Sequence, residues 1–176
     1  GEYGKIHIEV ADPDKSDFTL MDAQMRAEMI YNKTPFHLLF LDHAGLLAPR
    51  KWVSSTTERL NEIIRDAKRL AMKFNKGQGI PVVSLFQLSR EGFKAAEKNG
   101  GLYNLTHLSY ANEAERSSDI ITTTYLSDEM RKKNRVQFQC LKSRDQQPFD
   151  VFQAHVDWNC RRILTSFEVQ MIQSQT

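Results

Sequence analysis

The chain has 176 residues, of which 40% are hydrophobic and 26% are charged, and both fractions are ordinary for a globular protein. This composition argues against intrinsic disorder, and the length suggests a single domain, 1–176, with its core at about 5–168 and a tail at 169–176. Lysine and arginine number 24 and aspartate and glutamate 22, so the formal net charge is only +2. A nucleic-acid site therefore has to arise from local clusters of basic residues.

The two cysteines, Cys140 and Cys160, have no histidine or cysteine neighbours at metal-ligand spacing. This excludes a structural zinc site, which needs about four ligands, and we expect two buried free thiols in a reducing compartment. No apolar run approaches the roughly 20 residues of a membrane span, and no signal peptide is recognisable. The sequence begins at Gly1 instead of methionine, which we interpret as an excised segment or a tag-cleaved product.

The first part of the chain carries the patterns of a strand, a helix and a second strand. Residues 5–10 alternate apolar and polar side chains, which predicts a short half-buried strand. Thr19 and Asp22 resemble a capping box, and the apolar spacing after them predicts a helix over about 20–32. The short apolar run 36–41 predicts a strand that is buried on both faces, as in a parallel sheet between helices.

The clearest pattern in the sequence is a long amphipathic helix over about 56–76, which follows a loop at 43–54. Ser55 and Glu58 form a capping box at its start, and the apolar residues that follow recur at the spacing of one buried helical face. A second buried strand is predicted at 80–86. The alternation of strands and helices indicates an α/β architecture.

The second half of the chain begins with a polar segment, from Gln87 to about Ser118, that is predicted to be a long loop. A loop of that length in a compact domain is usually functional. A third strand over 119–125 and a charged turn from Arg131 to Arg135 follow. The alternation beyond this turn predicts a meander of three antiparallel strands, at 136–142, 149–156 and 161–167. The whole pattern predicts an α/β fold with a mostly parallel central sheet, extended by this antiparallel carboxy-terminal meander, and a frayed tail over 170–176.

Four polar side chains occupy positions at which chemistry is expected. Asp42 follows a buried strand, where open α/β sheets bind ligands and a carboxylate can hold a magnesium-bound water, or it caps a turn. Gln87 follows the next buried strand and would lie beside Asp42, where an amide can sense a γ-phosphate or an attacking water, or else it caps a helix or a turn. Lys142 and Arg144, two residues apart at a strand end, can clamp phosphates together or form a solvated basic turn.

In this order, these features resemble the ATPase domain of DnaB-type replicative DNA helicases, which has a RecA-like three-layer fold. The sequence Leu-Leu-Phe-Leu-Asp-His-Ala-Gly-Leu-Leu at 38–47 is similar to the Walker B strand of that family. Residues 80–90 are similar to the family's strand with a Ser-Gln-Leu-Ser-Arg motif. Residues 105–119 align without a gap to the stretch before the next strand, with Glu115 and Asp119 retained. The resemblance covers nearly the whole chain.

The resemblance implies a role for each of the four side chains. Lys142 and Arg144 match the family's Lys-x-Arg hairpin and would reach the nucleotide of an adjacent subunit, with Arg144 as the arginine finger. Asp42 would coordinate the Mg²⁺ of bound ATP through water, and Gln87 would couple the nucleotide state to the loop that follows it. That loop and the loop at 43–54 would touch single-stranded DNA in the central channel of a ring. The basic residues of these two loops, for which a solvated surface position is the alternative, are Arg50, Lys51, Arg90, Lys94 and Lys98.

The sequence also departs from the family. It contains no G-x-x-x-x-G-K-[ST] motif, and it lacks the strand with the family's catalytic glutamate, the amino-terminal domain and the linker helix. The family's Arg-Glu-Ser-Gly stretch reads Ser109-Tyr110-Ala111-Asn112 here. We therefore expect the carboxy-terminal two-thirds of a RecA-like domain, cut from a longer helicase or split from a separate chain.

The function favoured by the sequence is the carboxy-terminal part of an ATP- and Mg²⁺-dependent replicative helicase that translocates on single-stranded DNA, with this chain alone inactive. The expected partners are single-stranded DNA, further copies in a hexameric ring, and a primase or helicase loader, without a membrane. The expected location is the cytoplasm, in a nucleoid or a viral replication complex. Two alternatives remain, a P-loop-free structural or DNA-binding subunit and a filament-forming recombinase of the RecA or RadA type.

Overall fold

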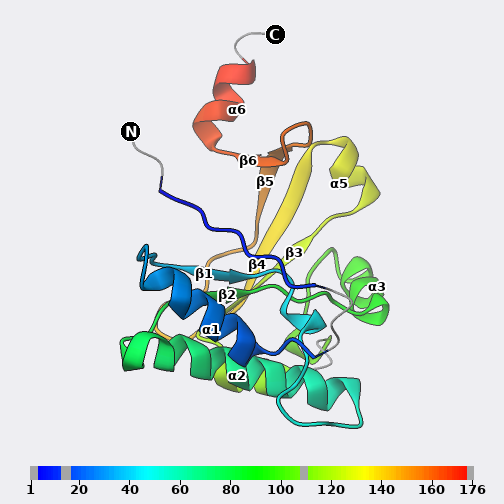
Figure 1. Ribbon diagram of the computed structural model, residues 1–176. Coiled ribbons are helices and arrows are strands. Elements are labelled where there is room, and N and C mark those ends of the chain that lie inside the picture. The colour runs from blue at the N-terminus through cyan, green and yellow to red at the C-terminus, as the bar shows by residue number, and fades with distance from the viewer. Residues whose placement is uncertain (1–3, 13–16, 108–110, 174–176) are drawn as a thin grey trace. The chain divides into compact units, whose positions relative to one another are not determined.

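The computed structural model describes residues 4–12, 17–107 and 111–173 (Figure 1). These residues belong to two compact units. The first unit lies within Gly1–Gln87 and Asn112–Ser118, and the second within Leu88–Ala111 and Asp119–Thr176. Within the described ranges, no helix combines the length and the apolar character that a bilayer span requires.

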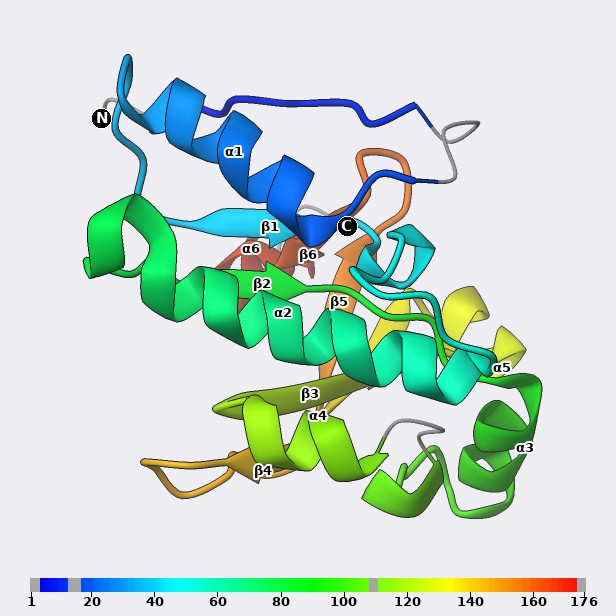
Figure 2. The same ribbon diagram turned by 60° about the horizontal axis from the view of Figure 1, so that its bottom comes forward.

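The first unit is built on a pair of parallel strands with helices on one face. Its elements are α1 (Leu20–Tyr31), β1 (Leu39–Leu41), the 3-10 helix η1 (Ala44–Leu46), α2 (Thr56–Gly77), β2 (Val82–Ser84) and most of α4 (Ala111–Ser117). β1 pairs with β2 so that Leu39 lies opposite Val82 and Leu41 opposite Ser84. α1 and α2 lie side by side against this pair, as Figure 2 shows.

The core of the first unit lies between α2 and the strands. The side chains of Ile63, Leu70 and Phe74 on α2 are at most 2% exposed. The Phe74 ring contacts Tyr31 of α1 and Phe36 before β1, with ring centroids 5.3 and 5.8 Å apart. These apolar contacts, each worth several kcal/mol in typical large-to-small substitutions, fix the strand pair against the helices.

Both predicted helices of this unit form, and their caps explain where they begin. The Thr19 hydroxyl accepts the N–H of Asp22, while the Asp22 carboxylate accepts the N–H of Thr19 at 2.8 Å, so the predicted capping box of α1 is confirmed. The hydrogen bonds from Thr19 hold the pKa of the Asp22 carboxyl below its ordinary value. Ser55 caps α2 by accepting the N–H of Glu58 at 3.1 Å.

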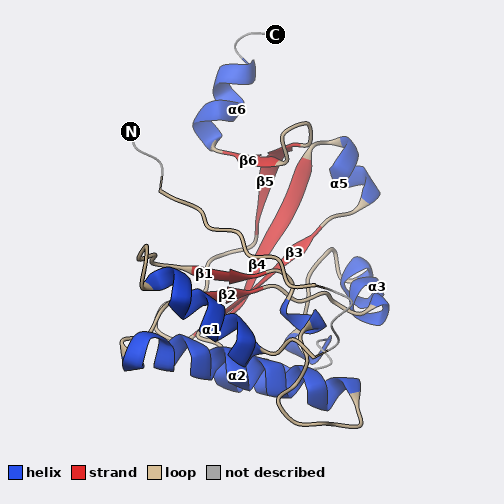
Figure 3. Ribbon diagram, in the orientation of Figure 1, coloured by secondary structure: helices blue, strands red, loops and turns tan. Residues whose placement is uncertain are grey.

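Two predictions for the first unit are wrong. Residues 5–10 form no strand, and Ile6 and Ile8 are 85% and 81% exposed along an extended segment, coloured as loop in Figure 3. Within the described residues, the apolar run 36–41 is not buried on both faces, because Phe40 is 61% exposed whereas Leu39 and Leu41 pack against the core of the unit. An apolar run does not tell how many of its faces are covered.

The second unit is built on an antiparallel sheet. Its strands are β3 (Ile120–Tyr125), β4 (Arg135–Ser143), β5 (Phe152–Asp157) and β6 (Arg162–Leu164), paired in this order. Its helices are α3 (Arg90–Lys98), η2 (Leu105–His107), α5 (Asp128–Lys132) and α6 (Ser166–Gln173). The predicted meander of β4, β5 and β6 is confirmed. The predicted α/β class is likewise confirmed, with a parallel pair and a four-stranded antiparallel sheet among the described residues.

Three predictions for the second half need correction. The segment 87–118 is no long loop, because it contains α3, η2 and α4. Part of the predicted turn at Arg131–Arg135 belongs to α5, and the predicted tail is helical as far as Gln173, with 174–176 outside the described residues. The thiols of Cys140 and Cys160 are free, as predicted, but the first is half-buried and the second exposed.

The turn after α3 approaches β3 so closely that it excludes a side chain at Gly101. Gly100 and Gly101 both have positive φ, at +64° and +82°, and only Gly101 faces other atoms. A Cβ on Gly101 would lie 2.5 Å from Cδ1 of Tyr125 and 2.9 Å from Nε2 of Gln137, whereas one on Gly100 would meet nothing within 4 Å. Backbone strain therefore acts at both positions, and steric overlap at Gly101 alone.

We expect Gly100→Ala to lower the free energy of unfolding by about 1 kcal/mol, because only the left-handed backbone is strained. Gly101→Ala should lower it by about 2–4 kcal/mol, because overpacking is added to that strain. Chemical denaturation of the two variants beside the parent chain measures this difference. Equal losses for both would contradict the close approach of the turn to Tyr125.

Candidate functional site

Asp42 stands at the carboxyl end of β1. The hydrogen bonds of the strand pair continue to this point, since the N–H of Leu85 donates to the Leu41 carbonyl at 3.1 Å. The chain then turns back, with the N–H of Ala44 donating to the Leu85 carbonyl, also at 3.1 Å. The Asp42 side chain is exposed, and its peptide bond to His43 is cis. The carboxylate is thus presented to solvent where open α/β sheets bind ligands.

Gln87 follows β2 by three residues and is also exposed. Because β1 and β2 are parallel and in register, their carboxyl ends meet at one edge of the sheet. The structure therefore places Asp42 and Gln87 beyond the same edge of two neighbouring strands. In this arrangement the carboxylate of Asp42 and the amide of Gln87 can both reach one ligand bound at this edge.

The acidic residues present fit a magnesium ion only in company with phosphates. No group of three or more histidine, cysteine or acidic side chains that could hold a metal occurs in the described ranges. Mg²⁺ commonly binds one or two carboxylates together with substrate phosphates and water. Asp42 can supply one such carboxylate, while a phosphate-cradling loop is not part of this sequence. Asp42 therefore fits Mg²⁺-nucleotide chemistry as one ligand among several.

A cavity of about 910 Å³ adjoins this edge within the first unit. Its lining includes Asp42 and His43 together with apolar side chains of α1 and of the extended segment, such as Ile6 and Ile30. The Nδ1 atom of His43 is buried without a hydrogen-bond partner among the described residues. No sequence pattern singles out His43, because burial of a single ring nitrogen depends on the tertiary structure.

Lys142 and Arg144 lie at the end of β4, in the second unit. Ile121 of β3 pairs with Lys142 and Thr122 with Cys140, so Leu141 is the extra residue of a β-bulge. The backbone N–H of Arg144 donates to the Asp119 carbonyl at 2.9 Å, and its Nε lies 3.4 Å from the Asp119 carboxylate. Both side chains of this ion pair are about half exposed, so the pair adds little to the stability of the fold.

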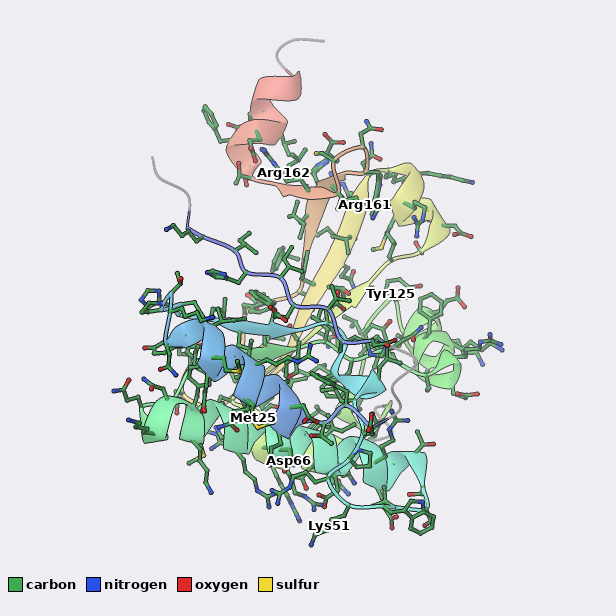
Figure 4. The ribbon with its side chains drawn as sticks, in the orientation of Figure 1. Met25, Lys51, Asp66, Tyr125, Arg161 and Arg162 are labelled. Atoms are coloured by element: carbon green, nitrogen blue, oxygen red, sulfur yellow. The ribbon has the colours of Figure 1, made fainter. Side chains whose placement is uncertain are left out.

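The loop at 43–54 is anchored to α2 by arginines. The Arg59 guanidinium donates to the carbonyls of Leu46 and Leu47 at 3.0 Å each. Arg50 lies 4.0 Å from the carboxylate of Asp66, which is 7% exposed and is also paired with Arg69 at 2.7 Å. Figure 4 shows Asp66 on α2 and Lys51 on the loop that precedes this helix. Arg50 thus has a structural contact, while Lys51 projects into solvent.

The other three predicted DNA-binding residues form one stripe on α3. Arg90, Lys94 and Lys98 are four residues apart and exposed, on the side opposite the buried Gly92 and Ala96. The polar composition of 87–118 predicted a loop here, so the alignment of these cations on one helix face was not predicted. Two features could have indicated the helix, because Ser89 accepts the N–H of Gly92 as an N-cap and small or apolar residues recur on one side.

One of the sequence expectations is only partly covered by the described residues. Ser109 and Tyr110 of the stretch that replaces Arg-Glu-Ser-Gly lie outside the described residues, while Ala111 and Asn112 begin α4.

In α4, Glu113 accepts a hydrogen bond from Arg65 of α2 at 2.8 Å. Burial acts against ionisation of Glu113, and hydrogen bonds from Ser117 and Arg65 outweigh it, so its pKa lies below the ordinary value.

One family model matches most of the chain. The model of the DnaB-like helicase C terminal domain family matches residues 2–159. Among solved structures, the chain is similar to an ATPase domain, with a TM-score of 0.72 and 23% identity over 86% of this chain and 52% of that one. It is also similar to a DnaB-like replicative helicase whose structure addresses its interactions with primase, with a TM-score of 0.71 and 23% identity over 85% of this chain and 35% of that one. A search of curated proteins finds no match.

These similarities confirm the predicted RecA-like helicase fold. The chain spans about half of the first of the two solved chains and about a third of the second. Similarity over part of their length therefore does not assign the activities of these whole proteins to this chain.

Proposed function

Because the chain belongs to the DnaB-like helicase C-terminal domain family, we propose that it is the carboxy-terminal part of an ATP-driven replicative DNA helicase motor. The observation that carries this proposal is the family match over 2–159, which includes all four candidate side chains. The parallel strand pair with Asp42 and Gln87 at its carboxyl edge supports it. One similar structure is of an ATPase domain and the other of a DnaB-like replicative helicase, which favours a helicase over a recombinase.

In the proposed motor, Asp42 binds the Mg²⁺ of ATP through water, and Gln87 responds to the state of the nucleotide. Lys142 and Arg144 of one subunit act on the nucleotide that a neighbouring subunit binds. There Arg144 stabilises the charge that develops on the transferred phosphoryl group. This role in trans requires a closed or helical assembly of copies, for which we propose a hexameric ring. The chain alone should not hydrolyse ATP, because a phosphate-cradling loop is not among its 176 residues.

The proposed DNA contacts come from the stripe Arg90, Lys94 and Lys98 on α3, and from Arg50 and Lys51 on the loop before α2. Cations of this kind bind the phosphates of single-stranded DNA without reading its sequence. Of the five, Arg50 should contribute least, because Asp66 already lies 4.0 Å from its guanidinium.

Further partners follow from the family and remain part of the proposal. One of the similar structures is of a DnaB-like helicase and addresses its interactions with primase. We propose that this chain likewise has a primase or a helicase loader as a partner. The proposed place of action is the cytoplasm, in the nucleoid or a viral replication complex, where duplex DNA is unwound for copying.

A second candidate function is a DNA-binding subunit without ATP turnover, favoured by the exposed basic stripe on α3, which can bind phosphates without a bound nucleotide. The two functions differ in what Asp42 does. In a motor it is catalytic, whereas in a binding subunit it only ends a strand.

We expect Asp42→Asn to lower ATP turnover by about 10²-fold or more in the motor assembled from this chain and a P-loop-bearing part, because a Mg²⁺ ligand is lost. Steady-state phosphate release with single-stranded DNA measures the effect. Asp128→Asn, which changes an exposed carboxylate of α5, is the matched control and should leave turnover unchanged. Turnover of Asp42→Asn within about twofold of the parent would favour the binding subunit.

The stripe on α3 predicts a salt dependence. Removing one phosphate contact by Lys94→Ala should weaken binding of single-stranded DNA and reduce the slope of log affinity against log salt by about 0.7. Fluorescence anisotropy of a labelled oligonucleotide at several salt concentrations gives this slope. Lys73→Ala, an exposed lysine on α2, should leave it unchanged. If both variants change the slope equally, the stripe is not the binding surface.

A further inference from the structure

Two glutamines of β4 face the segment that follows α3. Gln137 and Gln139 are alternate residues of the strand, so their side chains point to the same face of the sheet. Gln137 is 7% exposed and Gln139 half-buried. Amides in such positions are costly to bury unless they are hydrogen-bonded, so their partners indicate what they do.

The partners of both amides are backbone groups of one short turn. The Gln139 side chain accepts the N–H of Tyr103 at 2.9 Å and donates to the carbonyl of the same residue at 3.1 Å. The Gln137 amide donates to the Gly101 carbonyl at 3.0 Å. Gln139 therefore binds Tyr103 as a neighbouring strand would, through one donor and one acceptor.

The turn is packed as tightly as it is hydrogen-bonded. Tyr103 and Tyr125 are 5% and 6% exposed, with ring centroids 6.2 Å apart, and Phe93 of α3 stacks on Tyr125 at 5.4 Å. Burial raises the pKa of the Tyr103 and Tyr125 phenols above the ordinary value. Figure 4 labels Tyr125 on β3, from which it meets Phe93 of the helix.

The same contacts reach the residues before Arg144. Leu141, the bulged residue of β4, packs against the cluster of Ala96, Tyr103 and Tyr125. Lys142 follows it directly, and Arg144 follows β4. The basic stripe of α3 and the phosphate-clamping end of β4 are therefore parts of one packed body within the second unit.

The two amides both stabilise the turn and hold it in place. Apolar side chains at these positions would remove the hydrogen bonds to the N–H and carbonyl of Tyr103 and to the carbonyl of Gly101, next to a Tyr103 side chain that is only 5% exposed. Because a hydrogen bond keeps its two atoms within a narrow range of distances, the amides also hold the turn at one position on β4. This second effect is a positioning effect.

We propose that Gln137 and Gln139 are positioning residues that fasten the basic face of α3 to the strand that carries Lys142 and leads to Arg144. A shift of α3 on a bound single strand of DNA then moves the end of β4 with it. The attachment itself is a property of this chain, while its consequence for ATP turnover rests on the proposed function.

The attachment is tested by amide hydrogen exchange on the full chain with Gln139→Met, which keeps the side-chain length and removes both hydrogen bonds. We expect the Tyr103 amide to exchange about 10-fold faster or more, with the Phe138 amide of β4 within about twofold of the parent. Gln153→Met, which changes an exposed glutamine of the partner strand β5, is the matched control and should change neither amide. Unchanged exchange at Tyr103, or equal acceleration throughout the second unit, would overturn the attachment.

The positioning role is tested by ATP turnover of the assembled motor with and without single-stranded DNA. Gln139→Met should leave the DNA-free turnover unchanged. It should bind DNA with an affinity within about threefold of the parent, because the cations of α3 are intact. Its DNA-stimulated turnover, however, should be about 10-fold lower than that of the parent. A proportional loss of both turnovers, or unchanged stimulation, would overturn the positioning role. If the parent motor shows no DNA-stimulated turnover, the proposed function fails, and the exchange result alone decides the attachment.

Discussion

The parallel pairing of β1 with β2 is the constraint on which the candidate site depends. Leu41 lies opposite Ser84, and both strands end at the same edge, where Asp42 and Gln87 follow. A shift of one residue in this register would turn the Asp42 side chain to the other face of the sheet. Because α2 holds the pair through apolar contacts such as that of Phe74, the position of an exposed carboxylate is set by the packing of a buried core.

The second unit presents cations at the end of a long strand. Asp119 holds the Arg144 guanidinium at 3.4 Å, with both side chains about half exposed. An ion pair of this exposure is worth at most about 1 kcal/mol, so a phosphate of a neighbouring subunit could replace Asp119 at little cost. The pair thus keeps the arginine oriented without preventing the role that we propose for it.

Strong local patterns predicted much of the fold, and tertiary contacts account for the rest. The helix expected over 56–76 is observed at Thr56–Gly77, with non-helical backbone at Phe74, Asn75 and Lys76, because its apolar spacing and its cap at Ser55 agree. α3 was not predicted because its exposed face carries many charges and its buried face offers only small residues such as Ala96. The position of Asp42 could be predicted from a strand end, whereas the contact of Arg50 with the buried Asp66 could not, because it joins a loop to a helix face.

Mixing two inactive variants shows whether Arg144 acts on a nucleotide held through Asp42 of another copy. Rings of Asp42→Asn alone or Arg144→Ala alone should each turn over ATP about 10²-fold more slowly or worse. In mixed rings, some interfaces join an intact Asp42 to an intact Arg144, so we expect DNA-stimulated phosphate release to recover in part. No recovery in rings shown to contain both variants would contradict action in trans.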